Sequence, residues 1–222
     1  MRRTAALMLL AIPALAGCAG DPADDPAATP SASSPSASPE PSPTTITGTL
    51  ATPAAGATAV TYDPTLAPVG ATLSAALAPS GTGLSVTLTV AGLKPSRPYG
   101  AHVHTAPCGM QGTDAGPHLQ HTPDPKASAS PPSVDPSFAN PTNEVWLDVT
   151  TDTAGGGAVT ATAPWRFTDA PRSIILHAEK TKTEPGKAGT AGARIACLTL
   201  PVPGMAPMTP TAPTPTATAS PS

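Results

Sequence analysis

Charged and aromatic residues are both scarce in this chain of 222 residues. Asp, Glu, Lys and Arg make up 11% of the residues, Phe, Trp and Tyr only 3%, and the formal net charge is −3. No basic run follows Arg3, which excludes nucleic acid as an expected partner, because nucleic-acid binding relies on clustered Lys and Arg. With so few aromatic residues, a core must be built largely from Val, Leu, Ile and Ala.

Apolar runs long enough to span a bilayer are also missing. Residues 5–16 follow Arg2 and Arg3 and have the length of a signal-peptide core. They lead into the residues LAGC at positions 15–18, which resemble a bacterial lipobox, where the cysteine is lipidated. We therefore expect residues 1–18 to be a lipoprotein signal peptide and Cys18 to anchor an exported protein to the outer side of the cell membrane. The alternative is a plain secretory signal in which Cys18 is incidental.

Proline is abundant, with 32 residues, but unevenly distributed. Residues 19–44 and 204–222 consist almost entirely of small, polar and proline residues. Such segments lack the apolar side chains that offset the entropy of ordering a backbone, so we predict a disordered linker and a disordered tail. Residues 45–203 remain as one domain of ordinary size.

Apart from Cys18, the chain has only two cysteines, Cys108 and Cys197. In an exported domain two cysteines are expected to form a disulfide rather than to remain free thiols. The bridge would close a long loop and stabilise the fold by roughly 4 kcal/mol through its effect on the unfolded chain.

Helical periodicity is missing from residues 45–203. Short alternating or β-branched segments occur instead, separated by Gly, Pro and Asp. In Leu84–Val90, for example, Leu and Val alternate with Ser and Thr. The expected strands are residues 46–51, 57–62, 70–78, 84–90, 99–105, 145–151, 158–167, 173–178 and 194–202. About eight or nine short strands favour an all-β fold, an antiparallel sandwich or barrel.

Residues 106–142 interrupt this strand pattern with a long segment rich in proline. Loops of this length inside a compact domain are usually functional or disordered. The segment contains Cys108, His118 and His121. We interpret it as a functional loop that Cys108 fixes in place.

All five histidines lie between residues 102 and 177. His102 and His104 sit on one expected strand, where alternate side chains share a face about 7 Å apart and can reach one ion. The loop can fold His118 back over this pair. His177 lies in an apolar strand and needs a partner, because an unsatisfied buried imidazole is costly. The pair alone is weak evidence, and His177 alone could be a core histidine. Four such nitrogens suit copper or zinc, and their spacing does not choose between them.

Three blocks of the sequence, taken in order, resemble the copper/zinc superoxide dismutases. Residues 102–118, with the His-Val-His triplet, Cys108 and Gly116-Pro117-His118, resemble the family's first metal-binding block. Residues 174–177 resemble the strand that carries its last copper ligand, and residues 189–197 resemble its closing signature. This resemblance implies a Greek-key β-sandwich. It also implies copper-dependent conversion of superoxide into dioxygen and hydrogen peroxide.

The resemblance also implies roles for individual residues. The copper ligands would be His102, His104, His118 and His177. His118 would correspond to the family's histidine that bridges copper and zinc and carries a proton during catalysis. Arg194 would draw superoxide toward the copper, and a Cys108–Cys197 disulfide would brace the loop beside it.

The family's zinc site is not matched. Only His121 follows His118 closely, and Thr181 falls about where the family has an aspartate that links its two metal sites. A structural zinc normally needs four ligands, so we expect copper without zinc. His118 then needs another partner for its second ring nitrogen. Glu144 is the candidate for that role, and His121 is a second candidate beside the ligands. The nearby carboxylates, none of them placed by a motif, are Asp124, Asp135, Glu144 and Asp148.

Two alternatives to a dismutase remain. One is a surface lipoprotein that binds or buffers copper on the same sandwich, and the other is a structural domain with vestigial histidines. The sequence does not identify a copper donor.

Overall fold

The computed structural model of the protein describes residues 43–128, 130–167 and 172–200. The predicted signal peptide with Cys18, nearly all of the predicted linker and the predicted tail lie outside these residues. Within the described part of the chain, no helix is both long and apolar enough to cross a membrane. The first strand begins at Thr44, one residue before the predicted start of the domain.

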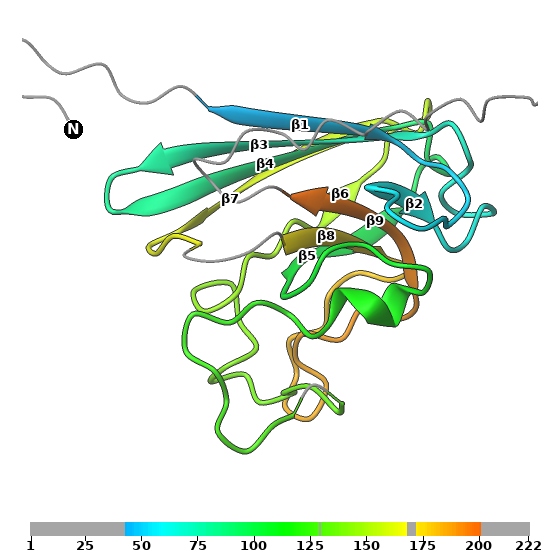
Figure 1. The fold of residues 1–222 in the computed structure, drawn as a ribbon. Helices are drawn as coiled ribbons and strands as arrows, with labels where there is room; N and C mark the ends of the chain where they lie inside the picture. The colour runs from blue at the N-terminus through cyan, green and yellow to red at the C-terminus, as the bar shows by residue number, and fades with distance from the viewer. Residues whose placement is uncertain (1–42, 129, 168–171, 201–222) are drawn as a thin grey trace, which may run out of the picture. The chain divides into compact units, whose positions relative to one another are not determined.

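The described residues form nine β-strands and one short 3-10 helix, η1 (Gly112–Ala115). The strands are β1 (Thr44–Thr49), β2 (Ala59–Thr61), β3 (Thr72–Ser80), β4 (Gly83–Ala91), β5 (Pro98–His104), β6 (Val149–Thr150), β7 (Gly157–Ala163), β8 (Arg172–His177) and β9 (Arg194–Leu200). One sheet has the order β1-β3-β4-β7 and the other the order β2-β9-β8-β5-β6, and the paired strands are antiparallel. The two layers lie face to face (Figure 1). The structure confirms the predicted all-β sandwich.

Each of the nine predicted strand segments overlaps an observed strand, and the largest difference concerns residues 145–151. Only Val149–Thr150 forms a strand there, as β6. The preceding residues still follow β5, because Leu147 N donates to Ala101 O at 2.7 Å. However, Ala101 N lies 3.4 Å from the carboxylate of Asp148 and has no backbone acceptor on this segment. This side-chain contact interrupts the regular ladder, so the predicted strand is shorter than its alternating sequence indicates.

The core lies between the two sheets and is mainly aliphatic, as the composition predicts. Leu73 and Leu88 face it from the first sheet, and Val103 and Ile174 face it from the second. Tyr99 is also fully buried, and its hydroxyl donates to the carbonyls of Leu66 and Lys94. Tyr99, one of the few aromatic residues, therefore packs in the core while its hydroxyl group is hydrogen-bonded.

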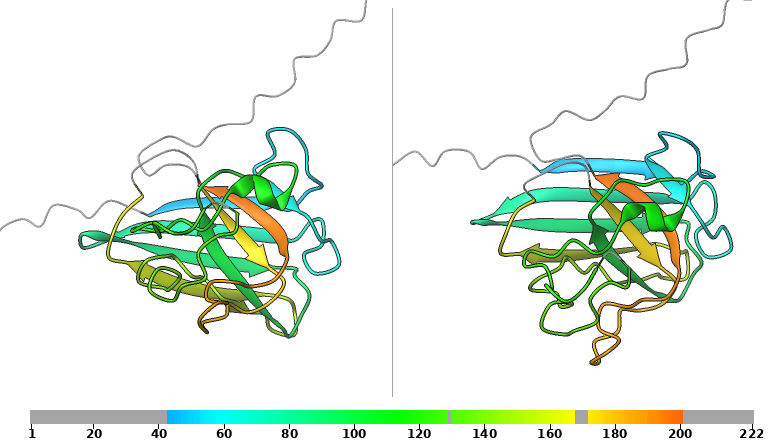
Figure 2. Two further views of the ribbon diagram at one scale, coloured as in Figure 1. Left: turned by 90° about the horizontal axis from the view of Figure 1, so that it is seen from below. Right: turned by 60° about the horizontal axis from the view of Figure 1, so that its bottom comes forward.

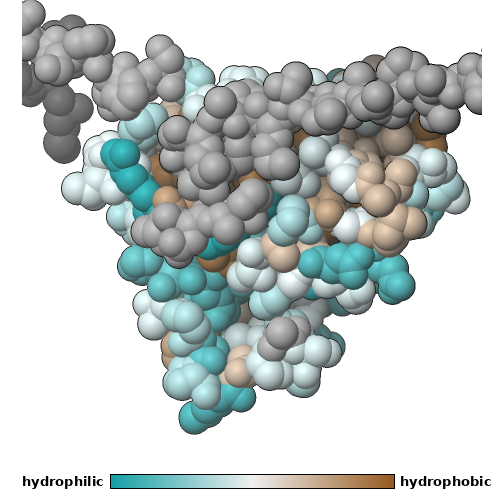
Figure 3. All heavy atoms as spheres, viewed as in Figure 1, coloured by the Kyte–Doolittle hydropathy of each residue, from teal (hydrophilic) through white to brown (hydrophobic). Residues whose placement is uncertain are grey.

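Two long connections cover the outer face of the second sheet. They are residues 105–148, between β5 and β6, and residues 178–193, between β8 and β9, and they project together from one side of the sandwich (Figures 1 and 2). On the face drawn in Figure 3 this projecting region carries mostly hydrophilic or neutral residues. A disulfide joins Cys108 in the first connection to Cys197 in β9, which confirms the predicted pairing. The predicted loop is thus fixed to the sheet.

Candidate metal centre

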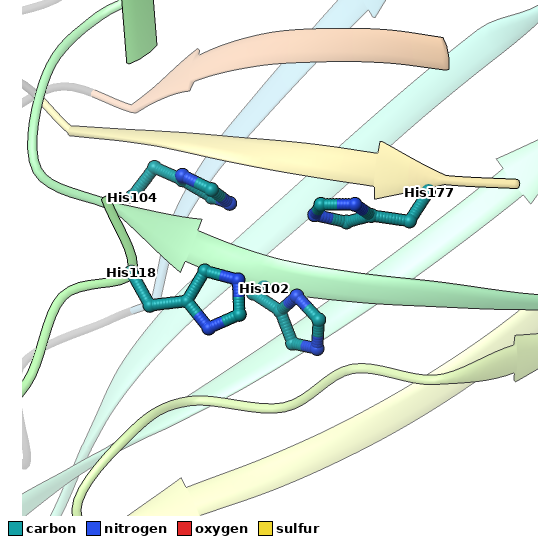
Figure 4. A group of neighbouring side chains, drawn as sticks. All are labelled: His102, His104, His118 and His177. Carbon is teal, nitrogen blue, oxygen red and sulfur yellow. The ribbon is translucent and has the colours of Figure 1, made fainter. Parts of the chain in front are cut away.

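Four histidines converge under these connections. One ring nitrogen from each of His102, His104, His118 and His177 lies within 4.8 Å of the others. His102 and His104 come from β5, His177 ends β8, and His118 comes from the long loop (Figure 4). In the β5–β8 pairing His177 is opposite Gly100 and His102 is opposite Ile175. The register therefore places three imidazoles on the same outer face of the sheet.

Short backbone contacts bring His118 to the strand. Thr105 N donates to Pro117 O at 3.0 Å, and Leu119 N donates to Val103 O at 2.8 Å. Gly116 makes this return possible, because its φ of 72° suits glycine and a Cβ there would lie 2.3 Å from Thr105 Oγ1. The glycine of the Gly-Pro-His triplet thus allows the loop to return closely enough to place His118 beside β5.

The outward-facing nitrogen of each ring has a hydrogen-bond partner. His104 Nδ1 lies 2.9 Å from Gly116 O, and His177 Nδ1 lies 3.3 Å from Gly192 O. A carbonyl only accepts, so both Nδ1 atoms carry the proton. His118 Nδ1 lies 2.8 Å from the Glu144 carboxylate, and His102 Nε2 lies 2.7 Å from Thr181 Oγ1.

The inward-facing nitrogens have no such partners. His102 Nδ1, His104 Nε2 and His177 Nε2 are buried and form no hydrogen bond. Buried polar atoms without partners are rare and costly, so three at one point need an explanation. Lone pairs aimed at one point are what a metal ion with imidazole ligands requires, and such ligands suit copper or zinc. The residues present therefore fit a bound metal.

Burial keeps these imidazoles neutral. It lowers the pKa of His102 and His104 well below the usual 6.5, and the neighbouring histidines and Arg194 lower it further. The pKa of His177 falls to about 3, mainly through burial. The neutral rings can offer lone pairs to a cation at pH 7, because a metal ligand must be deprotonated.

Arg194 lies beside the cluster. It lines a cavity of about 700 Å³ together with His118 and His177, and its Nη1 donates to Gly112 O at 2.8 Å. Burial lowers the pKa of its guanidinium from 12.5. An arginine nonetheless remains a cation in proteins. The structure therefore puts a positive charge beside the histidines, where the resemblance implied one.

Glu144 forms the contact predicted for it. Its carboxylate is 1% exposed and accepts from His118 Nδ1, from Trp146 Nε1 at 2.6 Å and from Gln120 Nε2 at 2.9 Å. Three donors compensate for the burial of this acidic group. The second ring nitrogen of His118 is thus held by a carboxylate.

His121 is not a member of the cluster, which corrects its candidacy as a residue beside the ligands. Its exposed ring stacks on Trp165, with the ring centroids 5.3 Å apart and the planes at 9°. The neighbouring aspartates serve the loop itself, since Asp124 accepts from Ser133 Oγ and Asp135 accepts from Ser137 N. The His121 amide donates to Asn143 O at 2.8 Å, so the backbone of this residue is fixed while its ring packs on Trp165 instead of the ligands.

Sequence reasoning gave no role to Asp148 and only noted the position of Thr181. The signal for Asp148 was the alternation of Glu144, Trp146 and Asp148 with the buried residues Val145 and Leu147. Alternate residues of an extended segment share a face. The polar members of this segment therefore lie on the histidine side of β5.

A family model described as copper/zinc superoxide dismutase matches residues 70–199. The chain belongs to this family. The match covers more than half of the sequence and contains the whole histidine cluster, Arg194 and both cysteines of the disulfide. The two metals in the family's name are the ones that the imidazole ligands of this cluster suit.

Solved structures similar to this family member include a Cu/Zn superoxide dismutase from Brucella abortus. It has 17% sequence identity and a TM-score of 0.45, over 70% of this chain and 98% of that chain. A double mutant of a SOD-like protein from Bacillus subtilis has 17% identity and a TM-score of 0.43, over 58% of this chain and 88% of that chain. A comparison with curated proteins gave no significant match.

Proposed function

We propose that this protein is a copper-dependent superoxide dismutase that acts outside the cytoplasm without a zinc ion. The observation that carries the proposal is the set of three buried, unpartnered nitrogens on His102, His104 and His177. They lie close to His118, and His118 and His177 line a cavity that Arg194 also lines. A core histidine without a function would have a hydrogen-bond partner instead.

Copper bound to His102, His104, His118 and His177 would supply one-electron chemistry, in which one superoxide loses an electron to become dioxygen and another gains an electron and two protons to become hydrogen peroxide. Zinc cannot replace copper in this role, since it has no redox activity. The remaining tasks, which are binding the anion and delivering a proton, belong to the protein.

Arg194 would bind and orient the substrate. Superoxide is a small anion, and the Arg194 guanidinium is fixed by Gly112 O at 2.8 Å while it faces the cavity. Charge in a partly enclosed site attracts an anion more strongly than charge on an open surface. We expect Arg194→Ala to lower the dismutation rate and its sensitivity to salt while copper stays bound. An unchanged rate in this variant would exclude the steering role.

His118 would hold and release a proton at Nε2. Its Nδ1–H is directed to the Glu144 carboxylate, 2.8 Å away, which leaves Nε2 as the basic atom facing the site. A carboxylate on the far nitrogen fixes the tautomer and the orientation of an imidazole. His118 is also 13% exposed and lines the cavity, so a proton can reach it from solvent.

Glu144 supports the proposal of copper without zinc. In the family the second ring nitrogen of the corresponding histidine is bound to zinc, whereas here a buried carboxylate lies against that atom. Glu144 is itself engaged by Trp146 and Gln120. Elemental analysis of protein loaded with both metals should give one copper and no zinc per chain. One zinc per copper would overturn this part of the proposal.

The deciding experiment compares superoxide dismutation by the copper-loaded wild type with that of His177→Ala. We expect the variant to lose copper and activity, because three imidazoles hold copper less well than four. His121→Ala removes a histidine outside the cluster and should behave as the wild type. A copper-loaded but inactive wild type would favour the copper-buffering alternative. Loss of copper from the wild type on dialysis against a mild chelator would favour a structural domain.

The site of action is part of the proposal. The sequence before the domain has the pattern of a lipoprotein signal peptide ending at Cys18, and a cysteine pair joined as a disulfide is typical of exported proteins. We expect mass spectrometry of membrane extracts to find Cys18 lipidated. An unmodified, soluble mature form would contradict the anchor.

A further inference from the structure

His102 differs from the other three histidines in the nitrogen that it presents to the site. It directs Nδ1 inward, whereas His104 and His177 direct Nε2 inward. Its outward nitrogen is therefore Nε2, which must carry the proton if Nδ1 is to keep a lone pair. The two tautomers of a neutral imidazole are close in energy, so the choice depends on the partner of the outward nitrogen.

That partner is a hydroxyl held by a carboxylate. Thr181 Oγ1 lies 2.7 Å from His102 Nε2 and donates its proton to Asp148 Oδ1. Thr181 N donates to Asp148 Oδ2 at 3.0 Å. Because the carboxylate accepts the hydroxyl proton, the Thr181 oxygen presents a lone pair to His102. The order of donors then runs from His102 through Thr181 to Asp148.

From this chain of contacts, which rests on the proposed copper site, we propose that Thr181 and Asp148 are positioning residues that hold His102 as the Nε2–H tautomer with Nδ1 free for the metal. His102 is completely buried and Thr181 is 7% exposed, so bulk water does not replace the hydroxyl. We call the contacts from His102 through Thr181 to Asp148 the relay. Ala101 N on β5 also lies 3.4 Å from the Asp148 carboxylate, so the relay connects His102 back to the strand that carries it.

The relay also separates the tasks of two ligands. Glu144 contacts the ring of His118 directly, at 2.8 Å, whereas Asp148 reaches the ring of His102 only through a neutral hydroxyl. The side chain of His118 is 13% exposed and lines the cavity, whereas His102 is completely buried. Of these two ligands, His118 is therefore the one that solvent can reach for proton exchange, and His102 is suited to remain a ligand.

The first test uses the metal-free full-length protein, with isotope-labelled histidine, to identify the tautomer of each ring by NMR at neutral pH. We expect the Nε2–H form of His102 in the wild type and in Thr181→Ser, which keeps the hydroxyl. In Thr181→Val, which has a similar shape but no acceptor, the Nε2–H form should no longer dominate. Thr87→Val removes a hydroxyl on the opposite sheet and should leave His102 unchanged. A wild-type tautomer in Thr181→Val would overturn the proposal.

The second test measures copper affinity by competition with a chelator of known affinity. Loss of a group that orients a metal ligand typically weakens binding by about 10- to 100-fold, which we expect for Thr181→Val. Thr181→Ser should remain near the wild type, and Asp148→Asn should weaken binding. Equal affinity in the wild type and Thr181→Val would overturn the role of the relay. If the wild type itself fails to bind copper, the proposed function falls, and the tautomer measurement alone decides the relay.

Discussion

The two sheets of this sandwich are built alike on their inner faces and differ on their outer faces. In the first sheet, β3 and β4 alternate between buried residues and partly exposed ones. The outer residues are mainly Thr, Ser and Ala, and hydroxyls pair with each other, as Thr47 with Ser74 at 2.9 Å and Thr87 with Thr160 at 2.8 Å. None of its four strands carries a charged residue or a histidine.

In the second sheet, β5 and β8 are buried on both faces after their first residue. The two long connections cover the outer face, and the histidines lie beneath this cover. A hydroxyl on the first sheet can turn to water or to its neighbour, but a covered imidazole depends on what the fold supplies. In this protein, the polar residues that could bind a metal are therefore those on the covered face of the second sheet.

The largest expected effect is a loss of stability at acid pH, which comes from the buried histidines on the second sheet and has no counterpart on the first. His177 has a pKa of about 3 in the folded protein, against 6.5 as the ordinary value, so below pH 6.5 the unfolded chain binds more protons. Stability of the metal-free protein should therefore fall as the pH falls, by roughly 1.4 kcal/mol per pH unit for this histidine. His102 and His104 shift in the same direction and add to the loss.

Urea denaturation of the metal-free protein between about pH 6.5 and 4.5 measures this slope. His177→Gln should reduce the slope, while His121→Gln, which changes an exposed ring outside the cluster, should retain it. A stability that is flat across this range would contradict the neutral, buried state of the cluster.

The next effect concerns the disulfide that fixes the cover. Cys108 and Cys197 are 89 residues apart in the sequence, and their disulfide joins the long loop to β9. Replacing both by serine should destabilise the protein by roughly 4 kcal/mol on the chain-entropy model. Urea denaturation of the oxidised wild type and of the double variant provides the comparison. Equal midpoints would show that the cover is held by packing alone.

A smaller effect is expected at Gly100, where the cover approaches β5. A Cβ at this position would lie 2.6 Å from Ala191 Cβ and 2.7 Å from Glu179 O, so Gly100→Ala forces the connection after β8 away from the sheet. We expect a loss of roughly 1–3 kcal/mol, as for other overpacked sites, together with weaker copper binding. Gly156→Ala is the matched change beside the first sheet, where the nearest atom is 3.4 Å away. Equal losses in the two variants would contradict the close approach.

The sequence was sufficient to predict the strands because β-branched alternation is a local signal. Segments such as β4 follow the predicted bounds closely, with Leu84–Val90 inside Gly83–Ala91. The four clustered histidines and the disulfide were accessible through the family resemblance, since their order along the chain is preserved. The contact of Glu144 with His118 was predictable because, without zinc, the second ring nitrogen of His118 needs another partner.

The remaining parts depend on how loops fold over the sheet. Nothing in the spacing of His121 separates it from His118, and only the structure places its ring on Trp165. Thr181 and Asp148 are 33 residues apart in the sequence, and they meet because both connections close over β5. Such contacts arise from long-range packing, which a local pattern does not encode.

The smallest predicted effect tests the comparison with one hydroxyl from each sheet. Ser173 on β8 is fully buried and donates to Ala106 O at 2.8 Å, so Ser173→Ala leaves the Ala106 carbonyl without this donor. The expected loss is about 1 kcal/mol. Thr87→Val on β4 removes an exposed partner of Thr160 and should change stability by less than about 0.5 kcal/mol, since water can satisfy the remaining hydroxyl. Urea denaturation of the two variants measures the difference. If both changes were equally neutral, cover by the connections would not explain why polar groups on the second sheet need partners.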